Sequence, residues 1–167
     1  MTEVSINQQA RLSEHFTLAE LCKTKEKTKD GNIPSHAAIE NLKRLSGWLE
    51  MLRDEYNKRY SLPLTPSKER GNYEQPIVIN SGYRSPQVNK LVGGVATSNH
   101  LTGCAVDIRV LGMEQLLRYA VILLDISDES GEDFDELLIE RNAKGTYWLH
   151  FAVRPDGNRR KIKLLEG

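Results

Sequence analysis

The sequence predicts an α+β fold in a single domain, with a small and largely antiparallel sheet flanked by helices. From Ser35 to about Tyr60, apolar residues recur at every third or fourth position, which indicates a long amphipathic helix. Two strand-like runs, 134–141 and 147–153, are separated by a short turn segment and therefore predict a β-hairpin. Because a hairpin is antiparallel, this pattern favours α+β over a doubly wound parallel sheet.

Local signals predict the remaining elements of the domain, which we place at residues 1–167. Thr17 and Glu20 have the spacing of a capping box and predict a helix start. The other expected elements are bounded by Gly, Pro or Ser: a strand at Ile77–Ile79, a helix after Ser85-Pro86 through Leu91, a strand at Cys104–Val110 and a helix at Met113–Ile126. Residues 1–12 are expected to be flexible. Residues 155–167 are expected either to be flexible or to add an edge strand at Lys161–Leu165.

The charge balance excludes several classes of partner. Lys+Arg and Asp+Glu both total 23, so no global basic field attracts nucleic acid or an anionic membrane. No apolar run approaches the roughly 18 residues of a membrane span. The N-terminus lacks the positive start and apolar segment of a signal peptide, so we expect a cytoplasmic protein. We also expect a monomer.

Two histidines and one aspartate are candidate metal ligands. His100 and His150 lie next to or within predicted strands among apolar residues, and Asp107 lies inside a strand pattern. An unpaired carboxylate there would be costly to bury. Two imidazoles and one carboxylate would bind zinc and leave the fourth position open, as metal-assisted hydrolysis requires. The alternatives are hydrogen-bonded core histidines and a salt bridge between Asp107 and Arg84 or Arg109.

Several motifs along the chain resemble those of one enzyme family. In order, they are Glu14-His15-Phe16-Thr17-Leu18-Ala19-Glu20-Leu21, Ser81-Gly82-Tyr83-Arg84-Ser85-Pro86, Val88-Asn89, Val92-Gly93-Gly94, Ser98-x-His100-x-x-Gly103-x-Ala105-x-Asp107-Ile108 and Trp148-x-His150-Phe151. Together they resemble the peptidase M15 family of zinc D-alanyl-D-alanine carboxypeptidases and peptidoglycan endopeptidases, over roughly residues 13–154. The resemblance implies a Hedgehog/DD-peptidase-like fold.

The same resemblance implies a function and a set of site residues. One zinc ion per chain would be bound by His100, Asp107 and His150. Arg84 would stabilise the developing oxyanion, and the expected substrate contacts come from Arg84, Ser98, Tyr83 and Trp148, although Trp148 could equally pack beneath His150. The implied substrate is a D-Ala-containing peptidoglycan stem peptide or muropeptide. A cytoplasmic enzyme would reach the cell wall after lysis, through a holin or by another export route.

The general base departs from the family pattern. Better-known members place a glutamate three residues before the last histidine, where this sequence has Tyr147. Glu140, on the strand before the hairpin turn, is the best candidate instead. Its alternative role is a solvated strand-end charge paired with Arg141 or Lys144.

The register of the hairpin decides between these roles for Glu140. Pairing of Arg141 with Tyr147, or of Asn142 with Thr146, would put Glu140 on the face of His150. A four-residue loop would turn it to the other face. Without this base, the rival function is a non-catalytic zinc- or peptidoglycan-binding module, as in Hedgehog-type signalling domains. A dipeptidase for free D-Ala-D-Ala is a third possibility.

Overall fold

The computed structural model describes residue 7, residues 9–60 and residues 74–166. The helices in these ranges are α1 Leu18–Leu21, α2 His36–Tyr60, α3 Pro86–Leu91, the 3-10 helix η1 Asn99–Thr102 and α4 Met113–Ser130. The strands are β1 Ile79–Ser81, β2 Ala105–Arg109, β3 Glu136–Arg141, β4 Tyr147–Ala152 and β5 Lys161–Glu166. The elements follow the expected order, with η1 added before β2.

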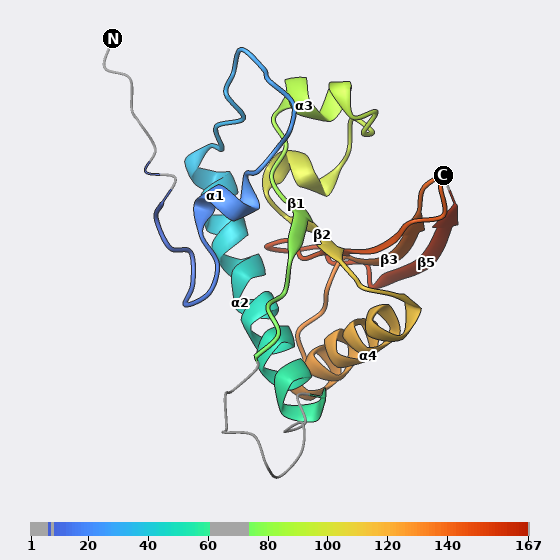
Figure 1. Ribbon diagram of the computed structural model, residues 1–167. Helices are drawn as coiled ribbons and strands as arrows, with labels where there is room; N and C mark the ends of the chain where they lie inside the picture. The colour runs from blue at the N-terminus through green and yellow to red at the C-terminus, as the bar shows by residue number, and fades with distance from the viewer. Residues whose placement is uncertain (1–6, 8, 61–73, 167) are drawn as a thin grey trace, which may run out of the picture.

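The strands form one sheet in the order β1-β2-β4-β3-β5. Every neighbouring pair is antiparallel except β3 and β5, which run parallel. The largely antiparallel α+β fold is therefore confirmed. The C-terminal segment adds β5 as an edge strand, which is the first of the two alternatives considered for it (Figure 1).

One face of the sheet packs against the helices. Val106, Ile108, Leu149, Phe151 and Leu137 are buried in a core cluster that also contains the apolar stripes of α2 and α4. α4 lies against the C-terminal half of α2 (Figure 1). Because side chains alternate along a strand, the residues between these core positions project from the opposite face. That opposite face carries the candidate site.

The predicted start of α1 is confirmed in detail. Thr17 Oγ1 accepts a hydrogen bond from the backbone N–H of Glu20 at 3.3 Å. In return, Glu20 Oε2 accepts one from the backbone N–H of Thr17 at 2.9 Å. The reciprocal pair satisfies two backbone donors at the helix start, as a capping box requires.

Several predicted boundaries were wrong by one residue or more, among them the start of β3 at Glu136 rather than Phe134. The physical reasons are clearest for two others. β1 begins at Ile79 rather than Ile77, because its pairing with β2 starts at Ile79 and Ile108 and passes through a bulge to Ser81. α4 continues to Ser130 rather than Ile126, since its last, polar turn remains helical until Gly131 adopts a left-handed conformation with φ 72°. In both cases the apolar pattern shows where a segment is buried, and backbone hydrogen bonds extend or shift the element.

Two further expectations concern the chain ends and the membrane. Most of the expected flexible segment at residues 1–12 lies outside the described residues. Within residues 9–60 and 74–166, no helix combines the length and the apolar character needed to cross a membrane.

Candidate metal centre

A tight turn brings His100 next to the strand that carries Asp107. Ser98 caps η1, with its Oγ accepting from the backbone N–H of His100 at 3.3 Å. Gly103 ends η1 at φ 73°, a conformation that favours glycine. A Cβ at Gly103 would also lie 2.5 Å from the carbonyl oxygen of Ala38. Only glycine fits this turn, which reverses the chain into β2 and lets two residues seven positions apart face one point.

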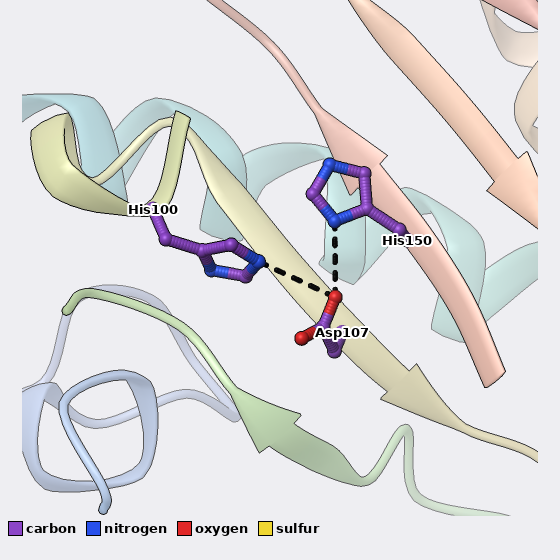
Figure 2. A group of neighbouring side chains, drawn as sticks. All are labelled: His100, Asp107 and His150. Carbon is purple, nitrogen blue, oxygen red and sulfur yellow. Dashed lines mark hydrogen bonds and ion pairs between the residues drawn. The ribbon is translucent and has the colours of Figure 1, made fainter. Parts of the chain in front are cut away.

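The sheet brings the third residue to the same place. Asp107 on β2 pairs directly with His150 on β4, so their side chains share a face. His100, Asp107 and His150 are 2%, 7% and 6% exposed. Both imidazole rings point at the carboxylate (Figure 2). The structure therefore brings all three predicted ligands into one buried group.

The distances in this group suit a tetrahedral metal. Asp107 Oδ1 lies 3.3 Å from His100 Nε2 and 3.0 Å from His150 Nδ1. The three candidate ligand atoms lie within 4.8 Å of one another. Zinc with bonds of roughly 2.0–2.1 Å at tetrahedral angles separates its ligand atoms by about 3.3 Å. The two separations from Asp107 Oδ1 fit this spacing, so the group could hold a metal ion, and three ligands leave the fourth position open.

Neighbouring groups fix which ligand atoms face the centre. His100 Nδ1 lies 2.6 Å from the carbonyl oxygen of Gly82. Because a carbonyl only accepts, Nδ1 carries the proton and Nε2 is left for a metal. Arg84 Nη2 donates to Asp107 Oδ2 at 2.6 Å, and Arg84 Nε donates to Ser81 Oγ at 2.9 Å. The salt bridge that was considered as an alternative for Asp107 thus uses one carboxylate oxygen and leaves the other for the centre.

Mutual electrostatic stabilisation holds the group together. Burial would raise the pKa of Asp107, but the charges and hydrogen bonds of His100 and His150 hold it well below its usual range. Burial would likewise lower the pKa of His150, but the carboxylates of Asp107 and Glu136 raise it to about 9. A metal cation would replace the proton on His150 that this pair of carboxylates stabilises.

The hairpin has the register that places Glu140 on the site face. Arg141 pairs with Tyr147, and Glu140 pairs with Trp148, diagonal to His150. Glu140 is half-buried. Burial raises the pKa of its carboxyl group, as does the negative charge of Asp107, while the positive charge of His150 opposes the shift. The carboxyl group is therefore close enough to the candidate ligands to respond to their charges.

The remaining predicted site residues are distributed differently. Trp148 shares the face of His150 and pairs with Glu140, where burial raises the pKa of the Glu140 carboxyl group and hydrogen bonding from the Trp148 side chain lowers it. Ser98 caps η1 and lines a cavity of about 430 Å³ whose walls include none of the three ligands. Tyr83 packs in the hydrophobic core at 7% exposure, and burial raises the pKa of its phenol. The predicted contact between Tyr83 and the substrate stays a prediction.

Sequence analysis missed one acidic residue of the site. Glu136 Oε2 lies 3.2 Å from His150 Nε2. Glu136 is two strand positions before Leu138, which pairs with His150, and thus lies on the same face. The alternation that pointed to Glu140 also places Glu136 there, so the signal was present in the 134–141 run.

Comparison with known families agrees with this geometry. The model of the family described as Peptidase M15 matches residues 14–123, which is more than half of the chain. The matched region includes His100 and Asp107 and ends before the hairpin that carries His150. No curated protein matches the chain. On the extent of this match, the chain belongs to the peptidase M15 family.

Proposed function

We propose that this protein is a zinc-dependent peptidase that hydrolyses D-Ala-containing peptidoglycan peptides, as a D,D-carboxypeptidase or an endopeptidase. Family membership implies a metallopeptidase. The observation that carries the proposal is the buried group of His100, Asp107 and His150, with Glu140 on the same face of the sheet. The choice of peptidoglycan rests on the motif resemblance.

The three ligands would hold zinc through His100 Nε2, Asp107 Oδ1 and His150 Nδ1. Two imidazoles and one carboxylate form a donor set that is typical of catalytic zinc sites with one open position. When bound, zinc supplies a Lewis acid that polarises the scissile carbonyl. The sheet face and the η1 turn keep the ligands buried, so the protein itself excludes most water from around them.

Glu140 is proposed as the general base. Its carboxylate takes a proton from the attacking water and then passes that proton to the leaving amine. The raised pKa of Glu140 favours this double role, because a base with a pKa nearer the working pH both accepts and releases protons readily. The same feature speaks against a purely metal-binding module, which needs no such carboxylate.

Arg84 is proposed to stabilise the developing oxyanion. Ser81 and Asp107 hold its Nε and Nη2 groups in place. Its Nη1 forms no hydrogen bond with another described residue, so it remains available as a donor. A preorganised guanidinium suits an oxyanion because its donors need no reorganisation during the reaction. Trp148 is also proposed to contact the substrate, because it lies on the same face and directly opposite Glu140.

Mass spectrometry of muropeptide digests tests the proposal. We expect zinc-loaded protein, but not chelated protein, to cleave a peptide bond next to D-Ala. Glu140→Gln should lower turnover by roughly 10²–10⁴-fold, because general base catalysis contributes about that much. Glu129→Gln, an exposed substitution at the end of α4, should leave turnover unchanged.

The outcomes of this experiment separate the rival functions. Zinc binding without release of any amine would contradict the proposal and favour a binding module. Cleavage of free D-Ala-D-Ala but of no muropeptide would favour a dipeptidase. Full turnover by the Glu140→Gln variant would show that Glu140 is not the general base.

A further inference from the structure

We propose that Glu136 is a positioning residue of the metal centre, which holds the His150 ring so that Nδ1, and not Nε2, faces the metal. The inference rests on the metal site proposed above. Glu136 pairs with Ala152 on β4 and lies diagonal to His150 on the same face. Its Oε2 atom is 3.2 Å from His150 Nε2, while His150 Nδ1 is 3.0 Å from Asp107 Oδ1. The two ring nitrogens are thus bound to different carboxylates on opposite sides of the ring.

The carboxylate of Glu136 is surrounded by hydrogen-bond donors. Its Oε2 accepts from Asn99 Nδ2 at 3.0 Å, and its Oε1 accepts from Arg159 Nη2 at 3.0 Å and Lys161 Nζ at 3.2 Å. An ionised carboxylate only accepts hydrogen bonds, so His150 Nε2 must donate to it. A histidine that donates through Nε2 offers Nδ1 to a metal, because the hydrogen bond at one ring nitrogen decides which nitrogen is metallated.

Glu136 also links the two elements that carry the histidine ligands. Its Oε2 accepts from Asn99, the residue before His100 on η1, and from His150 on β4. Asn99 is held further by Asp135, which accepts from its Nδ2 at 2.7 Å. Because a single oxygen atom contacts both elements, Glu136 fixes the orientation of one ligand relative to the turn that carries the other.

The geometry separates Glu136 from the other carboxylates of the site. Asp107 lies on the Nδ1 side of the His150 ring, where the three ligand atoms converge. Glu136 lies on the Nε2 side, so the ring stands between it and the metal position. Glu140 pairs with Trp148, on the far side of Leu138 along β3. Glu136 therefore acts through His150 rather than as a ligand or a base.

Zinc affinity, measured by competition with a chromophoric chelator, tests the proposal without any need for substrate. Glu136→Leu should weaken zinc binding by roughly 10–100-fold, as expected when the outer partner of a histidine ligand is lost. Glu136→Gln keeps one hydrogen-bond acceptor for His150 and should therefore lose less zinc affinity than Glu136→Leu. Lys161→Met breaks the same cluster without removing the acceptor of His150, so it should bind zinc as the wild type does.

Long-range ¹H–¹⁵N NMR of the zinc-loaded protein provides a second readout, which a merely structural role would not change. In the wild type, His100 should bind through Nε2 and His150 through Nδ1. In Glu136→Leu, His150 should no longer bind zinc through Nδ1 alone. In Glu136→Gln, binding through Nδ1 alone should be restored. The proposal is overturned if wild-type His150 binds zinc through Nε2, or if Glu136→Leu keeps full zinc affinity. It is also overturned if Lys161→Met loses as much zinc affinity as Glu136→Leu. If the wild type binds no zinc, the proposed function fails first.

Discussion

Residues 98–109 supply two candidate ligands through a local turn, whereas residues 136–152 supply the third through the pairing of a hairpin. In the first segment, Gly103 and the Ser98 cap fix the chain between His100 and Asp107. In the second segment, the position of His150 depends on its register against β2 and β3. The family match covers the first segment and stops before the second.

The two segments position their candidate ligands through different sequence signals. A turn is encoded by residues that are neighbours in sequence, so its motif can be recognised directly. A register is encoded by which face of each strand is buried, and a slip of one residue would move every side chain of that strand to the other face. The register between β3 and β4 therefore decides whether Glu136 and Glu140 share the face of His150.

The largest expected effect comes from removing one ligand from each segment. His100→Ala and His150→Ala should each lower zinc affinity by more than the roughly 100-fold that bounds the loss of an outer partner. Equal losses would show that the local turn and the hairpin contribute equally. The control is His36→Ala, an exposed residue at the start of α2. Titration with a competing chelator measures the zinc affinity. If either ligand variant kept full affinity, its segment would not supply a zinc ligand.

A smaller effect should follow from changing the turn of the first segment. Gly103→Ala would introduce both a strained φ and a contact of 2.5 Å with the Ala38 carbonyl oxygen. We expect a loss of about 2–5 kcal/mol in the free energy of unfolding, from backbone strain plus overpacking. Gly157→Ala is the matched control, because it has φ +64° but nothing within 4 Å of the added Cβ.

Urea denaturation measures both glycine variants. Gly157→Ala should lose only about 1–2 kcal/mol, the cost of the left-handed conformation alone. Equal losses in the two variants would mean that the close approach to α2 does not constrain the turn.

The smallest effect is the pH dependence of the chelated protein, which reports on the second segment. The pKa of His150 is raised from 6.5 to about 9, so the folded chain holds a proton that the unfolded chain releases. This stabilisation is fully present below pH 6.5 and is lost as pH rises through 9. We expect the free energy of unfolding to fall over that window by about 1–3 kcal/mol. Zinc affinity should rise over the same window, since zinc displaces that proton.

The control for this pH effect is His150→Asn. Urea denaturation of the chelated variant between pH 6.5 and 9 should show a much weaker decline. An unchanged decline would assign the effect to another titrating group and would leave the electrostatic link between β2 and β4 unsupported.

Helix periodicity and hairpin spacing are local signals, so they could predict the fold class. The three candidate ligands were predicted from their residue types and from motifs that resemble those of the peptidase M15 family. The face of Glu140 could be stated only as a condition, since it depends on whether Arg141 meets Tyr147 across the turn. The strand alternation placed Glu136 on the same face as Glu140, but its contacts with Asn99 and His150 depend on the tertiary fold and could not be predicted. Tyr83 was predicted from its motif to contact the substrate, and its side chain is buried in the core cluster.

Anomalous X-ray diffraction at the zinc edge, from crystals of the zinc-loaded protein, tests most directly whether the two segments build one metal centre. The account predicts a single strong peak about 2.0–2.2 Å from His100 Nε2, Asp107 Oδ1 and His150 Nδ1. A peak that omits His150, or that lies beside Glu136 instead, would contradict it. So would the absence of any peak at these three residues.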